Sequence, residues 1–76
     1  MKKSEFKKIV REYLNEAYEF SGFKSLYIKV EDWNEYGYIA YCVMIVNTSI
    51  VHKFKVFSDS DKTKINDIKT EVYFLD

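Results

Sequence analysis

The sequence predicts an α+β fold, in which an N-terminal amphipathic helix packs on a four-stranded antiparallel sheet in the order α-β-β-β-β. Three observations predict it: an apolar stripe with helical spacing near the N-terminus, later segments in which apolar residues alternate with polar ones, and short polar turns between those segments. Short turns favour antiparallel hairpins, because parallel strands need long crossover connections. A small barrel capped by the helix is the alternative, since a closed barrel would also bury an apolar central strand.

Residues 4–21 are predicted to form the helix, because apolar residues recur there at the i, i+3, i+4 and i+7 positions of one helical face. Ser4 is expected to cap the first turn, since its hydroxyl can accept a free backbone N–H. Gly22 is expected to follow the last turn in the left-handed conformation, with Phe23 folding back onto the helix. The apolar face consists of Phe6, Ile9, Val10, Tyr13, Leu14, Ala17 and Phe20.

The strands are predicted at residues 25–32, 36–46, 50–57 and 68–75. Successive side chains of a strand point to opposite faces, so alternation of apolar and polar residues indicates a strand with one buried face. In the last strand, the side chains expected to point inward are those of Ile68, Val72 and Phe74.

The segment 36–46 differs from the other strands because it is apolar on both faces, with Ala40 and Cys42 on one face and Ile39 and Val43 on the other. One helix covers only one face of a sheet. A second copy of the chain or another partner is therefore expected to cover the rest. The polar segment 58–67 is predicted to be a turn, with a short helix starting after Asp59 or Ser60.

The length of 76 residues predicts a single domain, residues 1–76. Such a short chain is marginally stable alone, and its one cysteine excludes an internal disulfide. Aromatic residues make up 18% of the chain, and they suit both an efficient core and a protein interface. Homodimerisation is one expected source of additional stability.

The charge balance argues against a general nucleic-acid-binding protein. Lys and Arg together number 12, as do Asp and Glu, so the chain lacks the bulk positive charge of that class. No apolar run is long enough to cross a membrane, and the N-terminus does not have the pattern of a signal peptide. With a single thiol, the expected compartment is the cytoplasm. Arg11 is the only arginine among the 12 basic residues, and the other 11 are lysines. This preference for lysine over arginine is typical of AT-rich genomes, such as those of some bacteria and their phages.

Few residues of this chain suit catalysis. His52 and Cys42 are the only histidine and cysteine, and a nucleophilic pair needs a third group that orients the base. A zinc site needs three or four ligands, and the aspartates near Asp59 lack the glycine of a calcium loop, because Lys64 stands in its place. We therefore predict no catalytic residue, no metal site and no cofactor, and the protein is not expected to be an enzyme.

The predicted helix has basic residues near its start and acidic residues near its end, which opposes the helix dipole. The first strand returns antiparallel to the helix, so Glu31, Asp32 and Glu35 are expected to pair with Lys3 and Lys7.

The sheet face away from the helix is the predicted contact surface. It combines aromatic and lysine side chains, including Lys69 and either Tyr41 or Tyr38 from the central strand, and the turn after the first strand adjoins it. The predicted binding residues are Tyr27, Lys29, Trp33, Asn34, Glu35, Tyr36, Lys53, Lys55 and Tyr73.

This pattern predicts a small non-catalytic protein-binding module, such as a phage or mobile-element inhibitor that blocks a surface of a host protein. Tyr and Trp are enriched at protein interfaces, although Lys is not. The alternative is a single-stranded nucleic-acid-binding protein, because aromatic rings stack on bases while lysines neutralise phosphates.

Overall fold

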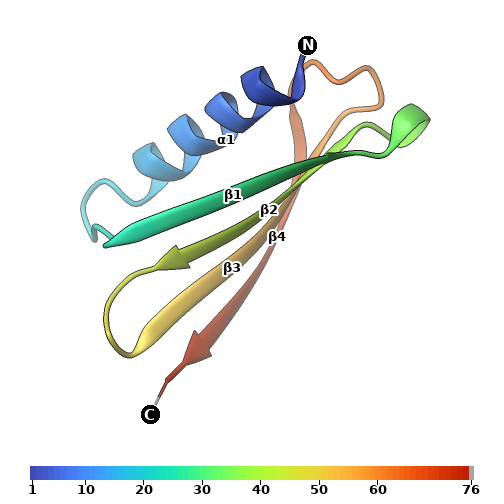
Figure 1. The fold of residues 1–76 in the computed structure, drawn as a ribbon. Helices are drawn as coiled ribbons and strands as arrows, with labels where there is room; N and C mark the ends of the chain where they lie inside the picture. The colour runs from blue at the N-terminus through green and yellow to red at the C-terminus, as the bar shows by residue number, and fades with distance from the viewer. Residues whose placement is uncertain (76) are drawn as a thin grey trace.

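The computed structural model describes residues 1–75, which form one helix followed by four strands. The strands make a single antiparallel sheet in the order β1-β2-β3-β4 (Figure 1), so β1 and β4 are its two edges. The predicted α+β fold is confirmed, and the barrel alternative is wrong because the sheet stays open. The elements are α1 (Lys3–Ala17), β1 (Ser25–Asp32), the 3-10 turn η1 (Asn34–Tyr36), β2 (Tyr38–Ile45), β3 (Ile50–Ser58) and β4 (Ile65–Phe74).

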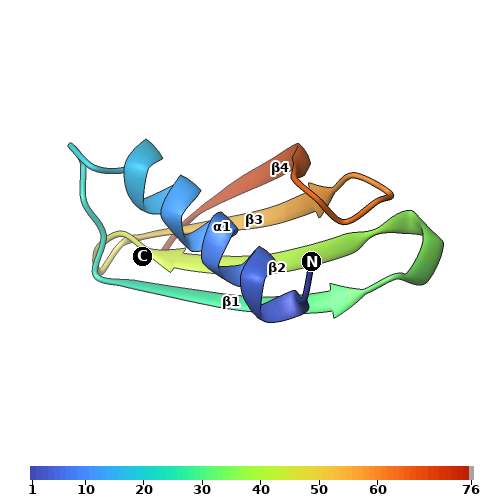
Figure 2. The ribbon, with the colours of Figure 1, turned by 90° about the horizontal axis from the view of Figure 1, so that it is seen from above.

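The core lies between α1 and the sheet face beneath it. The helix packs mainly on β1 and β2 and crosses them obliquely (Figure 2). Phe6, Val10 and Leu14, spaced one helical turn apart, are almost completely buried. The sheet contributes to the same core the side chains of Leu26, Ile28, Tyr38, Ala40, Cys42, Met44, Phe54 and Val56.

The helix begins earlier and ends earlier than predicted. Lys2 precedes the first turn, and the Glu5 carboxylate accepts its backbone N–H at 3.4 Å, whereas Ser4 lies inside the helix and does not cap it. The helix ends at Ala17, and residues 18–21 form turns that leave Phe20 98% exposed. Gly22 has the predicted positive φ of 72°, but its N–H donates to the Tyr18 carbonyl and closes this turn.

The reason for the early end is the side chain of Tyr18. Its hydroxyl lies 2.9 Å from His52 Nδ1, and its ring packs edge-on against Phe54 with centroids 5.8 Å apart. Phe23, as predicted, packs against the core. The chain therefore leaves helical geometry where tertiary contacts with β3 replace the last predicted turn.

The loop before β4 contains turns in place of the short helix that was predicted. The carboxylate of Asp59 accepts the backbone N–H of Thr63 at 2.7 Å, the hydroxyl of Thr63 at 2.6 Å and the N–H of Lys64 at 3.1 Å. These bonds satisfy the backbone groups without a helix. As a result, β4 starts at Ile65, earlier than predicted.

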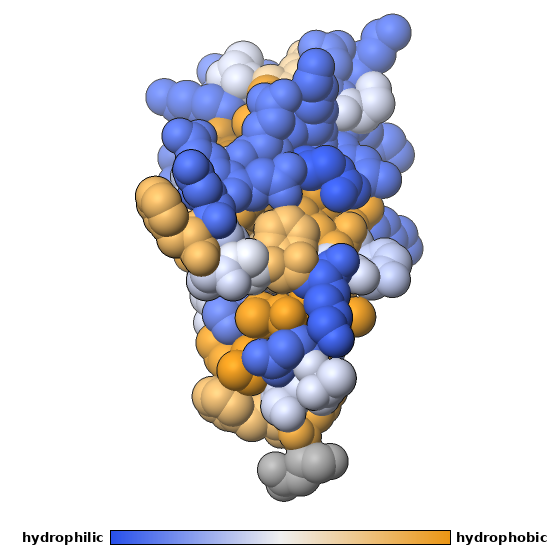
Figure 3. All heavy atoms as spheres, turned by 90° about the vertical axis from the view of Figure 1, so that its left-hand side faces the viewer, coloured by the Kyte–Doolittle hydropathy of each residue, from blue (hydrophilic) through white to orange (hydrophobic). Residues whose placement is uncertain are grey.

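The helix does not shelter the C-terminal end of β4. Val72 and Phe74 point to the helix side of the sheet, as predicted, but they are 45% and 74% exposed, and Leu75 is 52% exposed. Seen from the side that carries the helix, hydrophobic residues gather at the lower end of the molecule, below a hydrophilic upper part (Figure 3). The expected burial of Val72 and Phe74 is therefore wrong.

Candidate binding face

The sheet surface opposite α1 is called the open face here. The register of the strands places on it side chains that alternate with those of the core. It consists of Tyr27, Lys29 and Glu31 from β1; Ile39, Tyr41, Val43 and Ile45 from β2; Val51, Lys53, Lys55 and Phe57 from β3; and Asp67, Lys69, Glu71 and Tyr73 from β4.

A row of cations crosses the open face. Lys29 lies opposite Tyr41, Tyr41 lies opposite Lys55, and Lys55 lies opposite Lys69. All three lysines are exposed. Lys55 and Lys69 are direct cross-strand neighbours, and like charges in that arrangement destabilise a sheet. The repulsion within this row lowers the stability of the isolated chain, and the same positive charges would attract an anionic partner.

A shallow hollow of about 400 Å³ lies on the open face over β2, β3 and β4, lined in part by Tyr41 and Val43. Lys53 Nζ lies 4.9 Å from the centroid of the Tyr73 ring, and Lys69 Nζ lies 5.7 Å from that of Phe57. These cation–π contacts hold lysine heads above an aromatic floor. The Tyr73 hydroxyl donates to Glu71, and this hydrogen bond raises the pKa of Tyr73.

A second hollow, of about 360 Å³, lies at the β1 edge, where Lys7 and Arg11 of α1 approach Tyr27, Lys29 and Tyr41. From the sequence, Lys7 was predicted only to pair with acidic residues at or after the end of the first strand, and Arg11 was assigned to no site. Their place beside β1 depends on the oblique crossing of α1 over the sheet, which residue spacing along one element does not determine.

Neighbouring side chains cover the apolar residues of β2 on the open face to different extents. Ile39 is only 7% exposed, and Tyr41, Val43 and Ile45 are partly exposed. Because Lys side chains carry long apolar stems, Lys29, Lys53 and Lys55 can shield β2 while their charged heads stay in water. Tyr38, by contrast, faces α1 and is buried, so Tyr41 is the central-strand tyrosine of the open face.

The turn that bears Trp33, Asn34, Glu35 and Tyr36 extends beyond the end of the sheet. Trp33 Nε1 donates to Glu31 Oε2 at 3.2 Å, which ties the indole to the open face. Tyr36 is 75% exposed, and both Asn34 and Glu35 are exposed. Of the nine predicted binding residues, Tyr27, Lys29, Lys53, Lys55 and Tyr73 share the open face; Trp33 borders it, and the other three form a separate tip.

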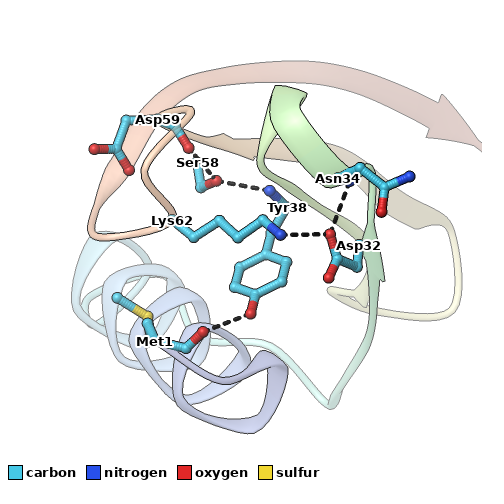
Figure 4. Close-up of polar contacts among 7 residues, drawn as sticks. All are labelled: Met1, Asp32, Asn34, Tyr38, Ser58, Asp59 and Lys62. Carbon is cyan, nitrogen blue, oxygen red and sulfur yellow. Dashed lines mark hydrogen bonds and ion pairs between the residues drawn. The ribbon is translucent and has the colours of Figure 1, made fainter.

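Polar contacts fix this turn against the loop before β4 (Figure 4). Asp32 Oδ1 accepts the Asn34 N–H at 2.8 Å and Lys62 Nζ at 2.7 Å. The Tyr38 N–H donates to Ser58 Oγ at 2.7 Å, and the Ser58 hydroxyl donates to the Asp59 carbonyl at 2.7 Å. The Tyr38 hydroxyl donates to the Met1 carbonyl, so the N-terminus joins the same cluster.

The ion pairs differ from those predicted. Within residues 1–75, Asp32 pairs with Lys62 and Glu31 pairs with Lys29, at 2.7 and 3.8 Å, in place of Lys3 and Lys7. The hydrogen bond from Lys62 is the main reason why the pKa of Asp32 is lowered; the charge of Lys3 makes the smallest contribution. Lys7 instead lines the hollow at the β1 edge.

Cys42 and His52 both lie on the helix side of the sheet, Cys42 in the core and His52 beside Tyr18 and Phe54. Cys42 is 2% exposed, and its burial raises the pKa of the thiol to about 11, which keeps it protonated. His52 is partly buried and hydrogen-bonded to Tyr18. Among residues 1–75, no group of three or more His, Cys, Asp or Glu side chains is placed to hold a metal ion.

The comparisons with known proteins add no family. No protein-family model, no curated protein and no solved structure matches the chain. In the part of the chain that the structure describes, no helix is long and apolar enough to cross a membrane.

Proposed function

We propose that the protein is a small non-catalytic binding module that acts in the cytoplasm by docking its open face on a partner protein. The row of Lys29, Tyr41, Lys55 and Lys69 carries this proposal. Two like charges placed directly opposite each other weaken the free sheet, and an acidic partner surface would remove that cost. The half-buried aromatic floor beneath the lysines would supply the apolar part of the contact.

The mixed charge of the open face favours a protein over a nucleic acid as the partner. Glu31, Asp67 and Glu71 lie on the same face as the lysines. These carboxylates would repel phosphates, whereas a protein surface can offer a basic residue to each of them. The charge pattern therefore supports a partner with its own mixture of acidic and basic residues.

A binding role of this kind suits an inhibitor from a phage or another mobile element, which blocks a surface of a host protein. The small size and the lysine-biased composition support this. Self-association into a homodimer is part of the same proposal.

The test is a comparison of two charge reversals. Wild type, Lys55→Glu and Lys8→Glu are immobilised and used to capture proteins from a bacterial lysate, and each candidate is then purified and titrated directly. Lys8 is exposed on α1, outside the open face, so its reversal makes the same change of net charge. We expect Lys55→Glu to lose at least tenfold in affinity and Lys8→Glu to bind as wild type. Equal affinities of the two variants would reject the open face as the docking surface.

Single-stranded nucleic acid is the second candidate, because Lys7 and Arg11 extend the cation row across the β1 edge. Polarisation measurements with labelled oligo-dT and oligo-U at low salt test it. Binding that weakens steeply with salt and is lost in Lys55→Glu would favour this candidate. Absence of binding would remove it.

A further inference from the structure

β4 is a long free edge of the sheet. It extends over ten residues, and among residues 1–75 the only strand that pairs with it is β3. The N–H of Leu75 donates to the Ser49 carbonyl at 2.6 Å, so odd-numbered residues of β4 direct their backbone groups toward β3. By the alternation of antiparallel pairing, Ile68, Thr70 and Val72 direct their backbone N–H and C=O groups outward, away from the sheet. These are the groups to which another strand can pair.

Of the usual protections of an edge strand, β4 has charged side chains, those of Asp67, Lys69 and Glu71, but these alternate in sign and can pair with the same residues of a second copy. The chain has no proline, and the one irregularity in the β3–β4 register, at Phe57 and Ser58, faces only the beginning of β4. The helix packs mainly on β1 and β2, at the other side of the sheet. Val72 and Phe74 are exposed on the helix side of β4, so apolar area is available beside the free edge.

We propose that β4 pairs antiparallel with β4 of a second copy, about a two-fold axis at Thr70. This register places Lys69 opposite Glu71 of the second copy, and the symmetry repeats that pair. Ile68 then lies opposite Val72 of the second copy, on the helix side. The backbone N–H and C=O groups of Ile68, Thr70 and Val72 then lie opposite those of Val72, Thr70 and Ile68 of the second copy. All of these groups point outward from their own sheets, as a hydrogen-bonded antiparallel pairing requires.

Charge excludes the two registers whose axis lies one residue away from Thr70. A two-fold axis at Lys69 would place Lys69 opposite its own copy and Asp67 opposite Glu71, which are like-charge pairs. An axis at Glu71 would place two Glu71 carboxylates opposite each other. A slip by one residue would put open-face side chains opposite helix-side ones and break the alternation of the sheet. The axis at Thr70 also gives Lys69 a carboxylate neighbour that offsets the repulsion from Lys55. An axis at Ile68 would also give Lys69 a carboxylate neighbour, that of Asp67, but it would align only residues 65–71, whereas the axis at Thr70 aligns residues 66–74.

The β1 edge suits a second copy less well. Lys7 and Arg11 of α1 line the hollow at that edge, so the same two-fold pairing through β1 would bring two basic clusters together. Pairing through β4 keeps the helices of the two copies apart and joins the two open faces in one continuous sheet. The inference rests on the homodimerisation in the proposed function and names its interface, whereas the partner of the open face is a separate matter.

The test uses Lys69→Glu and Glu71→Lys, alone and mixed, in sedimentation velocity over a concentration series. Wild type is expected to dimerise. Each variant alone replaces two opposite-charge pairs by two like-charge pairs, so its dimerisation should weaken by about tenfold or more. An equimolar mixture restores both opposite-charge pairs, since two glutamates of one chain then face two lysines of the other, and should form the heterodimer.

Folding is controlled within the same experiment. Lys69→Glu places a carboxylate opposite Lys55 of its own chain, so at a concentration where both proteins are monomeric this variant should unfold at a higher temperature than wild type. Glu71→Lys places a lysine opposite Lys53 of its own chain, and formation of the heterodimer in the mixture shows that this variant is folded. A monomeric wild type at every concentration would overturn both the dimer and its interface. A wild-type dimer that persists unchanged in both variants, or a mixture that forms no heterodimer, would overturn the interface alone. None of these results depends on the partner captured through Lys55.

Discussion

Lys55 and Lys69 lie directly opposite each other on β3 and β4, both exposed on the open face. We predict that Lys55→Glu raises the free energy of unfolding by about 0.5–1 kcal/mol, because it converts a like-charge cross-strand pair into an opposite-charge pair. Urea denaturation measures the change, preferably below the concentration at which the protein dimerises. Lys8→Glu, on the exposed surface of α1, should change the same quantity by less than about 0.5 kcal/mol.

The same substitution should weaken binding of the partner. A residue whose replacement stabilises the free fold and impairs binding is typical of a functional surface. If Lys55→Glu destabilises the fold, the two lysine heads do not repel each other in solution and the proposal loses its main support.

Gly37 is predicted to tolerate no side chain. Its φ is 96°, and a Cβ atom there would lie 2.5 Å from the Asp59 carbonyl oxygen and 2.5 Å from Ser58 Oγ. Gly37→Ala should therefore lower the free energy of unfolding by about 2 kcal/mol or more, from backbone strain and steric overlap together. Gly22→Ala is the control, because Gly22 also has a positive φ, of 72°, with no atom within 4 Å of a Cβ.

The control should cost only the backbone term, about 1 kcal/mol. Thermal unfolding of both variants at one concentration gives the comparison. Equal losses at the two glycines would show that the turn at Gly37 can move away from the loop before β4.

Acid should weaken the cluster at the end of the sheet. The hydrogen bond from Lys62 lowers the pKa of Asp32, and the hydroxyl of Thr63 is the main reason why the pKa of Asp59 is lowered. A carboxyl whose pKa is lower in the folded state stabilises the protein at pH values above the pKa of the unfolded state, which is about 4. This stabilisation is lost as the pH falls through the pKa of the folded state. The double variant Asp32→Asn, Asp59→Asn should therefore be less stable than wild type at neutral pH.

The difference should shrink below about pH 4, because both carboxyls of the wild type are then protonated. Urea denaturation at several pH values between about 2 and 7 measures this dependence. A difference between the two proteins that stays constant over this range would mean that neither carboxylate is held by its charge.

The thiol of Cys42 should resist modification. It is buried, and its pKa is raised to about 11, so the reactive thiolate is scarce at neutral pH. A maleimide at pH 7 should label the unfolded protein in urea much faster than the native protein. Rapid labelling of the native protein would show that the Cys42 thiol is accessible to solvent and reactive.

The fold could be predicted because its elements differ in hydrophobic period. Residues 25–32 alternate strictly and form β1 with the predicted bounds, while the apolar spacing of Phe6, Val10 and Leu14 indicates the buried side of α1. Element ends were predicted less well. The contact of Tyr18 with His52 ends α1 early, and such a contact depends on the folded arrangement, not on local spacing.

The candidate site was predicted in part. Alternation along each strand assigned Tyr27, Lys53 and Tyr73 to one face, and pairing of neighbouring strands followed from the short turns. The position of α1 relative to β1 did not follow, so Lys7 and Arg11 were not assigned to the edge of the open face. The partner of Asp32 was also missed, because Lys62 approaches it from a distant loop.

Docking through the open face can be measured by lysine footprinting. The protein is acetylated under native conditions with and without its purified partner, and the modification of each lysine is quantified by mass spectrometry. We expect Lys29, Lys53 and Lys55 to be protected in the complex, while Lys8 reacts as in the free protein. Full reactivity of those three lysines together with protection of Lys8 would contradict it.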